Sequence, residues 1–216
     1  MRKAPVRIAL IRHGQSVDNT RNVFVGAKTD SRLSELGILQ AAATGSYLLE
    51  AAPDAAAIYS SPLVRARDTA AIISKSLGVP LKIDIDLVEF DFGELDGLAP
   101  EEAYSKYPEM GRYWGPTISE PLPGGESAAA VAKRASEALK RIAAGHSPGE
   151  TVVVVSHQGA ITMGLAALIG ESEEYMRLVP SNCGVNWIEM GSDPKLTELN
   201  YIGHLMDLGH DDGTRP

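Results

Sequence analysis

Four consecutive valines at residues 152–155 constrain the fold of this chain more than any other feature. An uninterrupted run of β-branched apolar side chains favours a strand that is buried in a sheet. The run ends at Ser156-His157, and Gly159 precedes a helical pattern. A second apolar run, residues 6–11, ends in the same way at Arg12-His13-Gly14. If these two strands lie near one another in a sheet, both histidines emerge at one edge.

Segments typical of strands and of helices alternate along the chain. This alternation predicts a three-layer α/β/α sandwich with a mostly parallel central sheet, in which ligands bind at the carboxyl ends of the strands. The expected strands are residues 6–11, 57–59, 81–84, 151–155, 184–190 and 195–201, and the expected helices are residues 34–49, 61–77, 101–107, 127–144 and 160–169.

The chain shows no composition break that divides it. With 216 residues, of which 44% are hydrophobic, it can bury one sizeable core, so we expect a single domain over residues 1–216. Residues from about 96 to 125 are irregular and carry five prolines. An excursion of this length is typical of a functional lid. The polar tail from about 207 to 216 is expected to be loose.

The balance of charge and the single cysteine limit the classes of partner. A formal charge of −8 argues against a general nucleic-acid binder, which usually presents a basic face. Cys183 is the one cysteine, so an internal disulfide is excluded and a reducing compartment fits. We find no secretory signal and no apolar run long enough to span a membrane, and we expect a cytoplasmic protein. The oligomeric state stays open, a homodimer included.

The first strand end places a guanidinium and an imidazole side by side. The fork of Arg12 suits a phosphate or a carboxylate, and His13 can act as a nucleophile or a proton carrier near neutral pH. Arg65 lies in the first turn of the expected helix 61–77, where free N–H groups and the helix dipole already favour an anion. These residues together indicate phosphoryl chemistry.

An acidic segment follows the expected strand 81–84. Glu89 lies among apolar neighbours, which favour the neutral, proton-donating form of a carboxyl group. Asp91 and Glu94 are competing candidates on spacing alone. The residues themselves do not decide which carboxyl group donates, nor which of the two histidines attacks.

Six segments, in order along nearly the whole chain, resemble the histidine phosphatase superfamily, also called the phosphoglycerate mutase-like family. They are Leu10-Ile11-Arg12-His13-Gly14-Gln15-Ser16 with Asn19, Arg32-Leu33-Ser34-Glu35-Leu36-Gly37, Ser60-Ser61-Pro62-Leu63-Val64-Arg65-Ala66, Glu89 four residues before Gly93, Pro123-Gly124-Gly125-Glu126-Ser127, and Ser156-His157. The resemblance implies the phosphoglycerate mutase-like fold and a phosphohistidine mechanism.

In that mechanism His13 attacks phosphorus and Glu89 protonates the leaving oxygen, then assists the attack of water. The resemblance assigns the phosphate oxygens to Arg12, Arg65 and His157, with a further hydrogen bond from Asn19. It needs no metal and no other cofactor. Many members have glycine directly after the second histidine, whereas Gln158 stands here, so the pocket next to the phosphate must accommodate a glutamine.

The resemblance covers both phosphatases and mutases. The irregular segment from about residue 96 to 125, called the insert from here on, carries only two basic residues, Lys106 and Arg112. Its aromatic residues are Tyr104, Tyr107, Tyr113 and Trp114. This composition favours a phosphatase lid over the basic clamp of a bisphosphoglycerate-dependent phosphoglycerate mutase. We therefore expect an acid-phosphatase-type enzyme that acts on a small phosphorylated metabolite, with the mutase as the alternative.

Two other classes stay open. A metal-dependent hydrolase could use His13, His157 and Glu89 as ligands, although Arg12 and Arg65 would place fixed positive charges around the metal. A non-catalytic binding protein on the same fold is the other class, although every residue type needed for catalysis is present.

Overall fold

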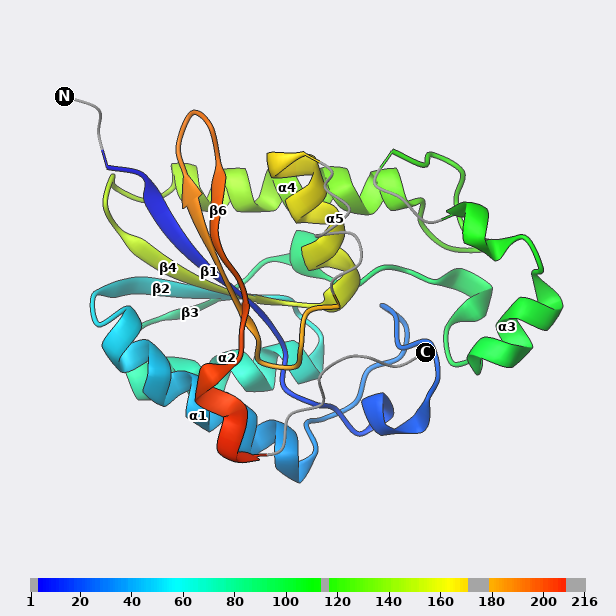
Figure 1. Cartoon of the computed structure of the whole chain (residues 1–216), viewed down its shortest axis with the longest axis horizontal. Helices are drawn as coiled ribbons and strands as arrows, with labels where there is room; N and C mark the ends of the chain where they lie inside the picture. The colour runs from blue at the N-terminus through cyan, green and yellow to red at the C-terminus, as the bar shows by residue number, and fades with distance from the viewer. Residues whose placement is uncertain (1–3, 114–116, 171–178, 209–216) are drawn as a thin grey trace.

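Six strands form one sheet in the order β3-β2-β4-β1-β5-β6. The computed structural model shown in Figure 1 describes residues 4–113, 117–170 and 179–208. The strands are β1 (Val6–Arg12), β2 (Ala55–Ser60), β3 (Leu81–Ile83), β4 (Thr151–Ser156), β5 (Val185–Met190) and β6 (Lys195–Tyr201). β1, β4, β2 and β3 run parallel to one another. β5 pairs antiparallel with β1, and β6 pairs antiparallel with β5. The predicted mostly parallel sheet is confirmed.

Two pairs of helices cover the two faces of this sheet (Figure 1). α1 (Glu35–Ala51) and α2 (Val64–Leu77) pack on one face, and α4 (Ala128–Ala144) and α5 (Gln158–Ile169) pack on the other. α3 (Pro100–Lys106) lies apart from both pairs, within the insert. The three-layer α/β/α architecture is therefore the one expected from the sequence.

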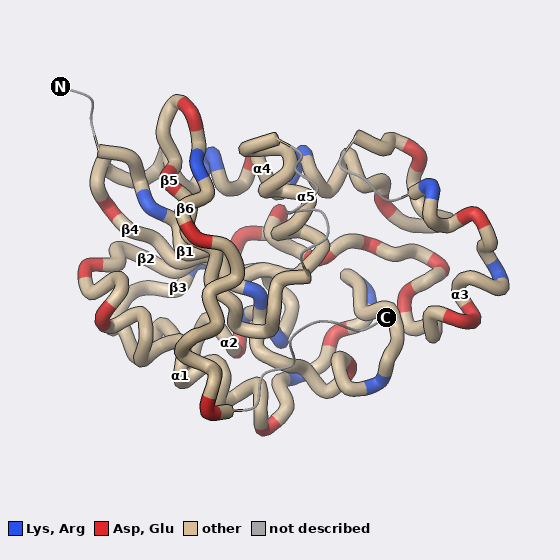
Figure 2. Tube along the Cα trace, viewed as in Figure 1, with Lys and Arg blue, Asp and Glu red and all other residues tan. Residues whose placement is uncertain are grey.

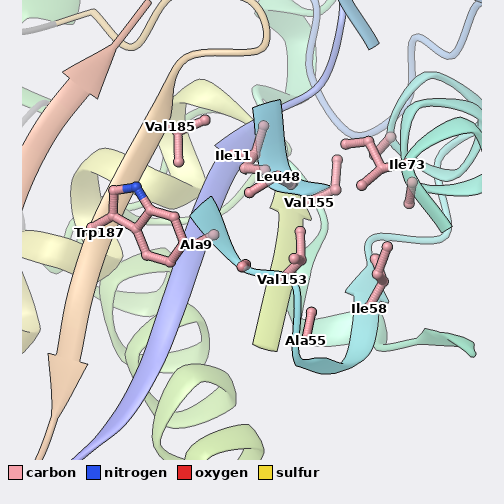
Figure 3. Close-up of a cluster of buried hydrophobic side chains, with 13 residues drawn as sticks. Ala9, Ile11, Leu48, Ala55, Ile58, Ile73, Val153, Val155, Val185 and Trp187 are labelled. Carbon is pink, nitrogen blue, oxygen red and sulfur yellow. The ribbon is translucent and has the colours of Figure 1, made fainter. Parts of the chain in front are cut away.

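The central strands β1 and β4 are buried on both faces. Ala9, Ile11, Val153 and Val155 point toward α1 and α2, as Figure 3 shows, where Leu48 and Ile73 complete the cluster. The alternate residues Ile8, Leu10, Val152 and Val154 pack against α4 and α5. Burial of both faces explains why both strands are almost entirely apolar.

The start of α2 differs from the prediction. We expected Ser61-Pro62 to open this helix, but it begins at Val64. The carboxylate of Asp30 accepts the N–H of Val64 with both oxygens at 2.9 Å, so a residue from a distant loop caps the helix. Ser61 lies outside the helix, and its hydroxyl is 2.8 Å from the ring of His157.

An apolar cluster joins α3 and the 3₁₀ turns Gly93–Leu95 and Met110–Tyr113 of the insert region to α4 and α5. Tyr113 is buried in this cluster and packs the insert onto the body, while Trp114 lies outside the described residues. The 3₁₀ turn Gly203–Leu208 packs on α1, so the polar tail that we expected from about 207 is held through Leu208. Residues 209–216 lie outside the described part.

Charges are interspersed along the chain rather than gathered into a basic face in the view of Figure 2. Within residues 4–113, 117–170 and 179–208, no helix is both long enough and apolar enough to cross a membrane.

Candidate active site

The pairing of β1 with β4 brings the two histidines together. Arg12 is in register with Ser156, and the N–H of His13 donates to the Ser156 carbonyl at 3.0 Å. His13 and His157 therefore leave the sheet at the same edge, the carboxyl end of two parallel strands. Their ring centroids are 5.0 Å apart with an interplanar angle of 61°. The structure thus places the two imidazoles edge to face inside the protein.

His13 is held in one tautomer. Its Nδ1 lies 2.7 Å from the carbonyl oxygen of Gly14, which can only accept, so Nδ1 carries the proton. Its Nε2 accepts from Nε of Arg65 at 3.2 Å. Burial, together with the charges of Arg65 and Arg12, lowers the pKa of His13 well below its usual value. The ring is therefore neutral, with the lone pair of Nε2 facing the guanidinium.

Arg65 is completely buried. Besides His13, its guanidinium donates to the carbonyl oxygens of Thr29 at 2.7 Å and Gly26 at 3.0 Å, and it lies 3.5 Å from the Asp30 carboxylate. Burial lowers the pKa of Arg65, while the carboxylates of Glu89 and Asp30 oppose that shift. The loop over residues 26–30 thus fixes the orientation of this cation.

His157 is also completely buried. Its Nε2 lies 2.8 Å from the hydroxyl of Ser61, which accepts the N–H of Leu63 at 3.3 Å and can donate its own proton to the ring. The hydroxyl can donate to Nε2 or accept from it, and Nδ1 of the same ring is a buried nitrogen without a hydrogen-bond partner among the described residues. Burial, then the nearby charges of Arg65 and Arg12, lower the pKa of His157 well below its usual value.

The segment over residues 180–183 forms hydrogen bonds with both Arg12 and His13. Nη1 of Arg12 donates to the carbonyl oxygen of Pro180 at 2.7 Å. Nδ2 of Asn182 donates to the carbonyl oxygen of His13 at 2.9 Å, and the N–H of Cys183 donates to that of Arg12 at 2.9 Å. The strand end that carries both side chains is therefore fixed by a segment from the far end of the chain.

Glu89 is buried at the amino end of α5. Its Oε1 accepts from the N–H groups of Phe90 at 2.8 Å and Ala160 at 3.0 Å, and its Oε2 accepts from Gly159 at 3.1 Å. We expected apolar neighbours around this carboxyl group. Phe90 and Ala160 are indeed buried, but they also present their backbone amides, because the amino end of a helix leaves its first N–H groups unpaired. Oε1 thus accepts two of these amides and Oε2 accepts one.

The competing carboxyl groups are engaged elsewhere. Asp91 forms an ion pair with Lys28 at 2.9 Å and accepts the N–H of Gly93. Glu94 is about half exposed and binds Lys106 and the hydroxyl of Tyr107 in the insert. Glu89 is the buried one of the three, and it lies within electrostatic reach of Arg65.

The two remaining predicted residues lie in the 3₁₀ turn Asp18–Arg21 and at the start of α5. The side-chain oxygen of Asn19 accepts from both the N–H and the hydroxyl of Ser16, at 2.9 and 3.0 Å. Gln158 is the first residue of α5 and is half-buried, between His157 and the amides that bind Glu89. Contacts of either side chain with a phosphate stay predictions.

The structure also reveals supporting residues that we did not predict. They are Asp30 and Asp96 around the Arg65 loop, Ser61 on His157, and Asn182 on His13. A short polar side chain in a predicted loop gives no periodic signal, and its partner lies far away in the sequence. Ser61 was visible only as an expected helix cap. In the described part of the chain, no three His, Cys, Asp or Glu side chains are grouped closely enough to hold a metal ion.

Known proteins are similar to this chain in sequence and in fold. A sequence profile described as "Histidine phosphatase superfamily (branch 1)" matches residues 8–201. A metal-independent phosphoserine phosphatase of Arabidopsis thaliana is 33% identical over 94% of this chain and 84% of its own length. A 2,3-bisphosphoglycerate-dependent phosphoglycerate mutase of Rhizobium johnstonii is 36% identical over 92% of this chain and 96% of its own length. The solved structure of Bacillus stearothermophilus YhfR superposes with a TM-score of 0.82 at 28% identity, covering 93% of this chain and 99% of that one.

A higher identity is found with a longer relative. The bifunctional protein Rv2228c of Mycobacterium tuberculosis is 40% identical over 75% of this chain, but the match spans only 44% of that protein. The profile, in contrast, covers the sheet and every predicted site residue, from the first strand to the last. The chain therefore belongs to the histidine phosphatase superfamily, branch 1.

Proposed function

We propose that this chain is a phosphomonoesterase that forms a phosphohistidine on His13. The observation that carries the proposal is the hydrogen-bonding of this ring. Nδ1 is tied to the Gly14 carbonyl, so the lone pair of Nε2 points into the site beside Arg65. A neutral imidazole with one nitrogen held and the other available is the form that attacks phosphorus.

In the first step, Nε2 of His13 bonds to phosphorus and the ester P–O bond breaks. Glu89 gives its proton to the leaving oxygen, which departs as an alcohol. The guanidiniums of Arg12 and Arg65 offset the charge on the phosphoryl oxygens. In this scheme Arg65 exchanges its contact with His13 for one with the phosphate.

In the second step, water attacks phosphorus and the P–N bond to His13 breaks. The Glu89 carboxylate accepts a proton from that water, and inorganic phosphate leaves. The imidazole recovers its lone pair on Nε2, and Glu89 is again protonated for the next ester. The enzyme is thus regenerated without any other group.

The environment of His157 supports a role in holding phosphate. Its Nδ1 is buried with no partner among the described residues, and in the tautomer that carries the proton on Nδ1 a phosphoryl oxygen would accept it. Asn19 and Gln158 are the two further side chains that we propose to contact the phosphate or the group attached to it. Asn19 lies in the 3₁₀ turn Asp18–Arg21 that follows β1, and Gln158 directly follows His157 at the start of α5.

Hydrolysis is the favoured outcome over phosphoryl transfer between hydroxyls. The insert has two basic side chains, and both are already ion-paired, Lys106 with Glu94 and Arg112 with Glu120. A mutase needs free cations that hold a bisphosphate during the exchange. The similarity to a phosphoglycerate mutase keeps that activity as the second candidate. In both cases the substrate is a small phosphorylated metabolite.

Rapid-quench labelling with a ³²P-labelled phosphomonoester tests the nucleophile. His13→Ala should abolish the acid-labile protein label, while His157→Ala should slow its formation and leave it detectable. A label that persists in His13→Ala and disappears in His157→Ala would reverse the two roles. No turnover of any ester by folded protein would favour a binding protein instead.

A panel of phosphate esters, assayed with and without 2,3-bisphosphoglycerate, separates phosphatase from mutase. We expect release of inorganic phosphate to exceed interconversion of phosphoglycerates under both conditions. Bisphosphate-dependent interconversion that exceeds hydrolysis would establish the mutase. Treatment with a chelator should leave the rate unchanged, because the cations around the phosphate are guanidiniums; loss of activity that a metal restores would support the metal-dependent class.

A further inference from the structure

Arg134, on α4, uses every N–H of its guanidinium. Its Nε and Nη2 donate to the two carboxylate oxygens of Glu126, both at 2.9 Å. Its Nη1 donates to the carbonyl oxygens of Asp86 at 3.0 Å and Val88 at 2.6 Å, and Nη2 also donates to that of Glu89 at 3.0 Å. Three backbone carbonyls within four residues are therefore gathered by one planar fork, a geometry that lysine cannot reproduce.

Glu126 also holds the backbone on the other side of Glu89, at Asp91. One of its carboxylate oxygens accepts the N–H of Asp91 at 3.1 Å, and its own N–H donates to the carbonyl oxygen of Asp91 at 2.9 Å. Glu126 belongs to the segment Pro123-Gly124-Gly125-Glu126-Ser127, which carried the family resemblance without a role in the chemistry. The Arg134–Glu126 pair thus holds the backbone on both sides of Glu89.

The side chain of Glu89 is fixed from the opposite end. The amides of Gly159 and Ala160, at the amino end of α5, bind its two oxygens. α4 and α5 pack directly against one another, so one rigid pair of helices holds both the backbone and the carboxyl group of Glu89. Arg134 also contributes to lowering the pKa of His157, after the larger effects of burial, Arg65, His13 and Arg12, so its guanidinium lies within electrostatic range of the site.

We propose that Arg134, paired with Glu126, is the positioning residue for Glu89. This inference rests on the proposed function, in which Glu89 protonates the leaving oxygen. Arg134 does not touch the reacting atoms. It acts by fixing the backbone from which the carboxyl group reaches the ester, so its loss impairs proton donation more than phosphoryl binding.

The dependence of rate on the leaving group isolates proton donation. p-Nitrophenyl phosphate has a leaving group that departs without a proton, whereas glycerol 2-phosphate must be protonated as the ester bond breaks. Arg134→Gln should lower kcat/KM for glycerol 2-phosphate at least about tenfold more than for p-nitrophenyl phosphate, since general acid catalysis is worth about 10²–10⁴-fold. Equal losses on both esters, or no loss, would overturn the proposal.

Arg141→Gln is the matched control. Arg141 lies on the same helix and binds the carboxylates of Asp84 and Asp86, in the same segment, but it is about half exposed. This variant should leave the ratio of the two kcat/KM values unchanged. A shift of the ratio as large as that of Arg134→Gln would show a general effect of loosening this segment and would overturn the assignment.

Glu89→Gln separates failure of this inference from failure of the proposed function. A selective loss on glycerol 2-phosphate in Glu89→Gln but not in Arg134→Gln rejects the positioning role alone. Equal losses in Glu89→Gln reject Glu89 as the proton donor, and with it the basis of the inference. In the Glu89→Gln/Arg134→Gln double variant, we expect no selectivity beyond that of Glu89→Gln.

If Arg134→Gln does not fold, two milder variants can be assayed on the same two esters. Arg134→Lys retains the charge but not the fork, and Glu126→Gln removes the charge that pairs with it. Each should show the selective loss on glycerol 2-phosphate. A ratio equal to that of the wild type in both folded variants would overturn the proposal.

Discussion

Nε of Arg65 donates to Nε2 of His13 across 3.2 Å, and His13 is only 3% exposed while Arg65 is not exposed at all. Protonation of this Nε2 would break the hydrogen bond and place two cations side by side. Desolvation acts in the same direction, so the pKa of His13 is held well below its usual value. The pair thus holds His13, the nucleophile that we propose, in its unprotonated form.

Replacing Arg65 should change the pH dependence of the reaction. In Arg65→Gln the pKa of His13 rises, because a neighbouring positive charge is lost, and protonation then begins at a higher pH. We expect the acid limb of kcat/KM to move to higher pH, together with a higher KM. Arg67→Gln is the control, because Arg67 is on the same helix but its side chain is half exposed. An acid limb that stays in place in Arg65→Gln would contradict this account.

Stability should also depend on these two rings. Burial, followed by the neighbouring charges, lowers the pKa of both His13 and His157 in the folded chain. In the unfolded chain the pKa of each histidine is about 6.5. Below that pH the unfolded state binds more protons, so the free energy of unfolding decreases as the pH falls. Urea unfolding at pH 7.5 and pH 5 should show this decrease. The His13→Gln/His157→Gln variant should lose less stability over the same interval; an unchanged loss would assign the effect to other groups.

Asp96 should matter for catalysis although it lies away from the reacting atoms. Its carboxylate accepts the N–H groups of Gly26 at 3.2 Å, Lys28 at 2.9 Å and Thr29 at 3.3 Å, as well as the Thr29 hydroxyl. The carbonyl oxygens of Gly26 and Thr29 in turn hold Arg65.

Asp96→Ala leaves this loop without its acceptor, so we expect kcat/KM to fall about tenfold or more, because a small misplacement of a catalytic group is costly. The same steady-state assay on Asp68→Ala, which removes an exposed carboxylate of α2, should give wild-type values. Wild-type kinetics in folded Asp96→Ala would mean that the loop holds Arg65 without it.

Gly159 is required by the close approach of Glu89. A Cβ built at this position would lie 2.7 Å from Oε1 of Glu89 and 3.4 Å from Cβ of Phe90. Gly159→Ala should therefore displace the carboxyl group, destabilise the fold by about 1–3 kcal/mol and reduce the rate on alkyl phosphates most strongly. Thermal unfolding and the two-ester assay measure these effects. Gly111→Ala, where a Cβ meets nothing within 4 Å, provides the control for the added methyl group.

The fold could be predicted where one strand or helix contains its own signal. β1 and β4 are buried on both faces, as the four valines of β4 and the mostly apolar sequence of β1 predict. Ser34 caps α1 through the N–H of Gly37, as its position before an apolar stripe indicates. α2 begins later than predicted because the cap, Asp30, comes from another loop. A contact between distant segments leaves no periodic trace in either of them.

In the candidate site, too, the residues at strand and helix ends could be predicted from the sequence, whereas their contacts with distant backbone groups could not. His13, Arg65 and His157 stand at strand and helix ends, where topology alone brings them together. The tautomer of His13 depends on the Gly14 carbonyl, and the environment of Glu89 depends on the amino end of α5. Both features require backbone geometry, which residue types and spacing do not specify.

The position of β1 has a consequence for biosynthesis. β1 precedes the other five strands in this sequence, yet it lies between β4 and β5, which follow it by most of the length of the chain. Until β5 is synthesised, the backbone N–H and C=O groups along one edge of β1 have no strand to pair with. The centre of the sheet, and with it the strand end that carries His13, is therefore completed only when most of this sequence has been made.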